Sequence, residues 1–144
     1  MGSEVMVRSV AWAIAMMALA CAGGTAETQK RDNLEDTVLY FHTHLKGGDF
    51  ERAAAYVAAE AAEAFQALHD PSRNVYRIQD FNVSSYIPEA NGSRSVVLVV
   101  ADVTRNNSTT VRQVRYREVW RDSGSGRWRL ISEELLVPRG GEGR

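Results

Sequence analysis

The apolar residues of this chain change their spacing once, and the change divides the chain into a helical half and a stranded half. Between residues 33 and 70 the apolar positions recur every three or four residues, which is the period of an α-helix with one buried face. From residue 75 onward apolar and polar positions alternate, which is the period of a strand. Helices followed by strands predict an α+β domain, with two helices packed on one side of a curved antiparallel sheet.

Two helices are predicted in the first half. Asp32 and Glu35 have the spacing of a capping box, and Gly47–Gly48 ends the first helix. Asp49 caps a second helix, which ends at Asp70–Pro71. The apolar stripe of the first helix consists of Leu34, Val38, Phe41 and Leu45, and that of the second of Phe50, Ala53, Ala54, Val57, Ala61, Phe65 and Leu68.

Alternation in the second half predicts strands over residues 75–87, 95–105, 110–121 and 127–137. In the first of them Tyr76 and Ile78 occupy one face and Phe81 and Val83 the other, so a β-bulge is expected near Gln79–Asp80. The second strand is apolar on both faces, which is typical of a central strand. Short turns rich in Asn, Ser and Gly join the strands, so the sheet is expected to be an antiparallel meander.

An apolar run, Val10–Ala20, comes directly before the single cysteine, Cys21. A helix of this length rises roughly 16 Å, about half a bilayer core, so the run resembles the apolar region of an export signal rather than a spanning anchor. Ala20–Cys21 resembles the lipobox of bacterial lipoproteins, although Ala18 stands where Leu is usual, and this resemblance implies a lipid on Cys21. The alternative is ordinary cleavage after Ala20 and a secreted protein with a free thiol.

The expected organisation is a signal peptide (residues 1–20), a lipidated cysteine with a flexible tether (21–32), a folded domain (33–138) and a disordered tail (139–144). Lipid attachment implies a bacterial cell envelope, at the outer membrane or the outer face of the inner membrane, with secretion as the alternative. The net charge of −1 gives no sign of nucleic-acid binding, and export disfavours it.

Two local patterns resemble those of the NTF2-like, or cystatin-like cone, superfamily. Leu45–Tyr56 reads Leu-x-x-Gly-Asp-Phe-x-x-Ala-x-x-Tyr, which in that family joins the first helix to the second. Tyr116–Trp120, a glycine turn and Trp128–Ile131 resemble the closing hairpin of small bacterial NTF2-like lipoproteins. The resemblance covers residues 33–137 and implies two helices on a cone-shaped sheet. It also implies a homodimer through the exposed sheet face, since members of the family often dimerise there.

Glu118 is the first candidate for a functional side chain. On an unbroken strand it shares a face with Val114, Tyr116 and Trp120, and on a concave face its carboxylate would lie between two aromatic rings. Loss of solvation would raise its pKa and make it an acid or a base near neutral pH. The alternative is a bulge at Glu118–Val119 that turns Glu118 to water. Glu134, alternating with the apolar positions of the last strand, and Asp102 are weaker candidates.

Other residues are assigned more than one role by the sequence. Residues two apart on a helix are separated by a rotation of about 200°, so His42 and His44 point to opposite sides. His69 lies at the end of its helix, where a positive charge is favourable. Neither a metal site nor a cofactor is therefore predicted. The remaining pocket-lining candidates, for which core packing is the alternative, are Tyr56, Tyr116, Trp120 and Trp128.

Three arginines, Arg115, Arg117 and Arg121, alternate on the face opposite Tyr116. An anionic lipid or a partner surface could contact them, and a solvated convex face balanced by Glu133 is the alternative.

Fold does not define function in this superfamily, which includes isomerases, dehydratases, hydrolases and carriers. The sequence favours a non-catalytic, lipid-anchored protein that binds a small apolar ligand or a protein partner. One alternative is an enzyme of isomerase or dehydratase type that uses Glu118 with Tyr56 or Tyr116. The other is a structural interaction module of the envelope.

Overall fold

The structure is a computed structural model that describes residues 22–73, 76–124 and 126–136. The predicted signal peptide, Cys21 and the tail lie outside the described residues. The chain divides into two units, residues 1–32 and 33–144, and the second contains the sheet. Within the described residues, no helix is both long enough and apolar enough to cross a membrane.

The first helix, α1 (Ala22–Lys46), begins at Ala22 rather than at Asp32. The predicted capping box therefore does not start the helix, and the segment predicted to be a flexible tether is helical from Ala22 onward. Ala26–Arg31 consists mainly of Ala, Glu, Gln, Lys and Arg, which have high helix propensity, so the helix continues through Asp32.

The predicted second helix is broken into three pieces: α2 (Phe50–Ala54), a short 3₁₀ helix η1 (Ala59–Ala61) and α3 (Ala62–His69). Its predicted cap is confirmed, because the Asp49 carboxylate accepts a hydrogen bond from the Arg52 N–H at 3.2 Å. The break follows from pairing with a strand. The Leu130 N–H donates to the Tyr56 carbonyl and the Ala58 N–H donates to the Leu130 carbonyl, each at 2.9 Å. These bonds override the helix propensity of the alanines.

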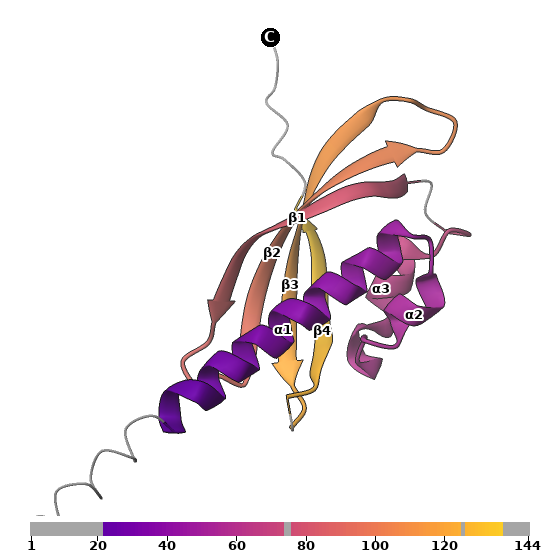
Figure 1. Cartoon of the computed structure of the whole chain (residues 1–144). Helices are drawn as coiled ribbons and strands as arrows, with labels where there is room; N and C mark the ends of the chain where they lie inside the picture. Colours follow the sequence, from indigo (N-terminus) through magenta and orange to yellow (C-terminus); the bar gives the residue numbers. More distant parts are fainter. Residues whose placement is uncertain (1–21, 74–75, 125, 137–144) are drawn as a thin grey trace, which may run out of the picture. The chain divides into compact units, whose positions relative to one another are not determined.

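The strands β1 (Tyr76–Pro88), β2 (Arg94–Arg105), β3 (Val111–Asp122) and β4 (Trp128–Leu136) form a four-stranded antiparallel sheet within the described residues. Their order is β1-β2-β3-β4, so each strand pairs with its neighbour in sequence. Figure 1 shows the strands curving, with the helices on one side of the sheet. The predicted α+β fold class is confirmed.

The predicted bulge in β1 is present. The register between β1 and β2 shifts between Ile78 and Asp80, which leaves Gln79 as the extra residue. Because of this shift, Phe81 and Val83 pack against the same core as Ile78.

A further bulge, which no signal in the sequence predicts, lies in β4. Val119 pairs with Ser132 whereas Trp120 pairs with Leu130, so Ile131 is the extra residue. A bulge reverses the alternation of every side chain that follows it along the strand. The residues of β4 after Ile131 therefore face opposite sides to those predicted.

Aromatic side chains fill the space between the helices and the sheet. The ring of Phe41 lies edge-on to Trp120, with centroids 5.3 Å apart, and also contacts Phe65. All three are fully or almost fully buried, together with Leu130. Truncating an aromatic residue in such a core typically costs about 3–5 kcal/mol, so this cluster is a main source of stability.

Candidate functional site

Among the described residues, two histidines and two glutamates have buried side chains and form two pairs, and Glu118 is the one of the four that the sequence predicts as a functional candidate. His42 comes from α1, next to Phe41, and His69 is the last residue of α3. Glu118 of β3 and Glu133 of β4 are direct partners in the strand register. Ionisable groups are rarely buried without partners, because the loss of solvation must be offset by charge or hydrogen bonding.

The first pair joins α1 to β3. His42 Nε2 lies 2.6 Å from Glu118 Oε1, and both side chains are fully buried. The Trp120 indole N–H donates a hydrogen bond of 2.9 Å to the other oxygen of Glu118. The carboxylate of Glu118 is thus held on both sides by residues of the core.

The second pair joins α3 to β4. His69 Nε2 lies 2.5 Å from Glu133 Oε1, and the two side chains are 4% and 1% exposed. The ring of His69 also packs against that of Tyr116, with centroids 5.7 Å apart.

The environment shifts these pKa values in different directions. Burial alone would raise the pKa of Glu118, but the His42 charge and hydrogen bond, with the Trp120 N–H, hold it below its ordinary value of 4.5. Burial alone would lower the pKa of His42, and the Glu118 carboxylate instead raises it above 6.5. Burial raises the pKa of Glu133, and the nearby Glu118 charge adds to the rise although His69 opposes it. The raised carboxyl pKa predicted for Glu118 is therefore wrong and belongs to Glu133.

The bulge at Ile131 explains why Glu133 was missed. Unbroken alternation would place Glu134 on the same face as Trp128 and Leu130, and Glu133 on the face of the predicted arginines. In the structure Glu133 is buried and Glu134 is exposed. The predicted balance between Glu133 and the arginines is thus wrong, and Glu134 is instead the register partner of Arg117.

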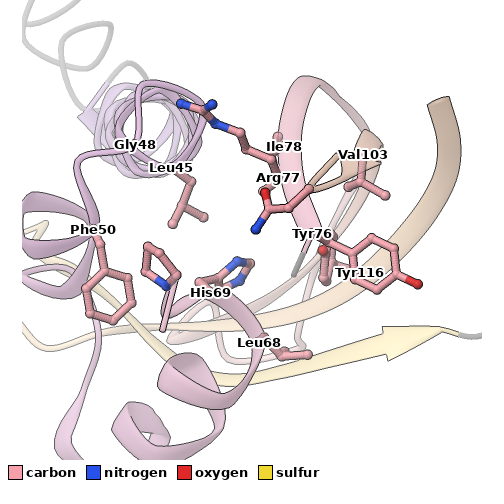
Figure 2. Close-up of a pocket in the computed structure, with 12 residues that line it drawn as sticks. Leu45, Gly48, Phe50, Leu68, His69, Tyr76, Arg77, Ile78, Val103 and Tyr116 are labelled. Atoms are coloured by element: carbon pink, nitrogen blue, oxygen red, sulfur yellow. The ribbon is translucent and has the colours of Figure 1, made fainter. Parts of the chain in front are cut away.

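A cavity of about 270 Å³ opens beside the second pair. We call it the apolar pocket. Figure 2 shows the His69 ring projecting from the end of α3 toward the sheet side, where Tyr116 lies. The lining of the apolar pocket consists of Leu45, Gly48, Phe50, Leu68, His69, Pro71, Tyr76, Arg77, Ile78, Val103, Asn106 and Tyr116.

A second recess, of about 520 Å³, adjoins the first and shares Tyr76 and Asn106 with it. We call it the arginine hollow, because Arg105 and Arg112 contribute its charged side chains. It lies at the β2–β3 end, and its lining is completed by Asn107, Ser108 and Thr110.

Of the five predicted pocket-lining residues, only Tyr116 lines the apolar pocket. Glu118, Trp120 and Trp128 are buried in the core, because helices α1 and α3 close over that part of the sheet. Tyr56 is half-buried and its ring stacks on His44, with centroids 6.1 Å apart.

The three arginines that were predicted to share one sheet face differ in their surroundings. Arg115 and Arg117 are exposed, whereas Arg121 forms an ion pair of 2.7 Å with Glu60. Asp102 is half-buried and alternates with the buried Ala101 and Val103, so it points away from the pocket. In the part of the chain that the structure describes, His, Cys, Asp and Glu side chains form no group of three or more suited to a metal ion.

Several solved structures share this fold. An NTF2-like protein with a cystatin-like fold from Novosphingobium aromaticivorans aligns with a TM-score of 0.61 and 16% identity, over 84% of this chain and 90% of that one. An NTF2-like protein from Cytophaga hutchinsonii aligns with a TM-score of 0.55 and 18% identity, over 75% of this chain and 98% of that one. A ketosteroid isomerase-like protein from Erwinia carotovora atroseptica aligns with a TM-score of 0.50 and 12% identity, over 72% of this chain and 94% of that one.

Comparison of the sequence with family models and with curated proteins gives no match. The likeness to the solved structures defines the fold alone. The chain has an NTF2-like, cystatin-like fold, as its resemblance implied.

Proposed function

We propose that this protein binds a small, largely apolar ligand in the apolar pocket, without catalysis. The observation that carries the proposal is the cavity itself, which remains open beside a core packed with aliphatic and aromatic side chains. Its volume of about 270 Å³ is slightly below the usual range of ligand sites, roughly 300–1,000 Å³, which favours a small ligand. Leu45, Phe50 and Ile78 supply apolar surface, and His69 supplies one polar group.

We further propose that the protein acts in a bacterial envelope, anchored by lipid on Cys21. The apolar run Val10–Ala20 before the single cysteine supports this location. A homodimer through the outer sheet face is part of the same proposal. Val96, Leu98 and Val100 are half-buried on that face and would gain from being covered.

Native mass spectrometry of the full chain, expressed in a bacterial host, tests ligand binding. We expect a reproducible non-covalent mass on each chain. A Leu68→Trp substitution places a larger ring in the lining and should remove at least about nine-tenths of the bound mass, since the ligand and the indole would compete for one space. Leu39→Trp is the matched control, because Leu39 is 51% exposed and does not line the pocket.

The same spectra test the rest of the proposal. Diacylglycerol on the wild type and its loss in Cys21→Ser would support the anchor, whereas an unmodified thiol would favour secretion. Absence of a dimer peak would count against the sheet-face interface. A ligand-free mass for the wild type and both tryptophan variants would overturn the binding function.

A second function, proton transfer of isomerase type, is favoured by the His69–Glu133 pair. Glu133 engages His69 Nε2, so Nδ1 is the nitrogen left for a ligand in the pocket. In this scheme Nδ1 takes a proton from a carbon next to a carbonyl and returns it to the far end of the resulting enolate. Glu133 positions the ring and touches no substrate. Glu118 has no direct part, because it does not line the pocket.

Turnover of a small β,γ-unsaturated cyclic ketone, followed by the absorbance of its conjugated product, tests this second function. His69→Gln should lower kcat/KM by roughly 100-fold, the lower range for loss of a general base. His44→Gln is the control, because His44 stacks on Tyr56 and lies outside the pocket lining. Glu133→Gln should shift the pH profile of kcat/KM. No turnover by the wild type, or equal turnover by the two histidine variants, would exclude the scheme.

A further inference from the structure

The apolar pocket and the arginine hollow adjoin but differ in chemistry. The pocket is lined mainly by aliphatic and aromatic side chains, whereas the hollow is lined by polar residues and two arginines. Because they share Tyr76 and Asn106, a molecule that fills the first can extend into the second. The combined recess therefore suits a ligand with two chemically different ends.

The permanently charged side chains that line this recess are all arginines. Arg77 lines the pocket and Arg105 and Arg112 line the hollow, whereas neither lining contains an Asp or a Glu. None of these three arginines forms an ion pair with any residue that the structure describes. Nearby acids are already engaged, since Asp70 pairs with Arg73 and Asp80 with Lys46.

The strand register brings Arg105 and Arg112 to the open end. Arg112 is the partner of Val103, and Arg105 is the partner of Tyr76, and both partners line the apolar pocket. Side chains paired across antiparallel strands lie on the same face of the sheet. The two guanidinium groups thus extend the pocket-facing surface beyond the apolar core, where they are exposed to solvent.

We infer that the ligand is a small amphiphile with one acidic head group. Its apolar body occupies the apolar pocket, and its carboxylate or phosphate contacts Arg105 and Arg112. The planar guanidinium fork matches the paired oxygens of such a group and forms charge-assisted hydrogen bonds with it. This inference rests on the ligand-binding function proposed above and adds the chemical class of the ligand.

Calorimetric titration of the full chain with probes of equal chain length tests the inference. Decanoate, decanol and decylamine present an anion, a neutral hydroxyl and a cation on the same apolar body. We expect decanoate to bind about tenfold more tightly than decanol, with decylamine weakest, since one charge-assisted contact is worth about that factor. Salt should reduce the difference, because the arginines are exposed. Decyl phosphate distinguishes a phosphate site from a carboxylate site, and tighter binding of either supports an acidic head group.

Arg105→Gln/Arg112→Gln should abolish the preference for decanoate over decanol and leave decanol binding unchanged. Arg115→Gln/Arg117→Gln removes the same charge from the opposite sheet face and is the matched control. Equal affinities of wild type for decanoate and decanol, or tightest binding of decylamine, would overturn this inference while the binding function stands. Failure of all four probes to bind would overturn both.

Discussion

Replacing Glu118 with alanine is expected to lower the free energy of unfolding by about 3–5 kcal/mol. Glu118 is fully buried between His42 and the Trp120 indole N–H. Its removal leaves an imidazole without a counter-charge and an indole donor without an acceptor, both away from water. The cost comes mainly from these orphaned groups, because a buried ion pair contributes much less when it is exchanged as a whole.

Urea denaturation of the wild type and variants measures this effect. Glu134→Ala is the control, since Glu134 is exposed on β4, and it should change the unfolding free energy by no more than about 0.5 kcal/mol. His42→Leu/Glu118→Leu removes both charges and should recover most of the lost stability. Equal stabilities of Glu118→Ala and Glu134→Ala would contradict the role assigned to the pair. If Glu118→Ala does not fold, recovery of folding in the double variant carries the same information.

The stability of the domain is expected to fall as the pH rises above about 6.5. Glu118 raises the pKa of His42 in the folded state above its ordinary value of 6.5. A group whose pKa is raised by folding contributes stability that is complete below the unfolded pKa and is lost as the pH rises through the folded pKa. The slope between these two pKa values approaches about 1.4 kcal/mol per pH unit.

In acid solution, Glu118 and Glu133 make opposite contributions to the pH dependence of stability. The pKa of Glu118 is lowered from 4.5, so its contribution is present above that pH and is lost as the pH falls through its folded pKa. The pKa of Glu133 is raised from 4.5, so its contribution is complete below that pH and is lost as the pH rises through its folded pKa. The greatest stability is therefore expected in mildly acid solution.

Urea titrations from mildly acid to mildly alkaline pH measure this dependence. Glu133→Gln should reduce the loss just above pH 4.5, and His42→Leu/Glu118→Leu should flatten the alkaline part of the curve. Asp70 and Asp80 have lowered pKa values through their exposed hydrogen bonds, and they are present in every variant, so their effects cancel. A wild-type stability that is constant or rises above pH 6.5 would contradict the ionised state assigned to His42.

Local signals in the sequence were sufficient for most of the secondary structure. The Asp49 side chain caps α2, and the conflict of alternation around Gln79 located its bulge. The break after Ala54 could not be predicted in this way, because alanine favours helix and the competing hydrogen bonds come from Leu130, far along the chain.

The candidate site was only partly readable for similar reasons. His42 follows Val38 by four residues and lies on the apolar stripe of α1, which was a signal that it would be buried. Glu133 gave no such signal, since the bulge at Ile131 has no distinctive residue. His69 joins the site only because α3 ends beside β4, and that placement depends on the break between α2 and α3.

The bulge in β4 also bears on how such an interior can evolve. β4 is the terminal strand of the sheet, and Ile131 lies between the apolar residues that anchor it and the two consecutive glutamates that follow. Deletion of Ile131 would remove the bulge and keep Glu133 opposite Glu118 and Glu134 opposite Arg117, so Glu133 would still face inward. The strand can therefore lose its bulged residue without exchanging the acid that faces the interior, because the pairing with β3 determines which glutamate is buried.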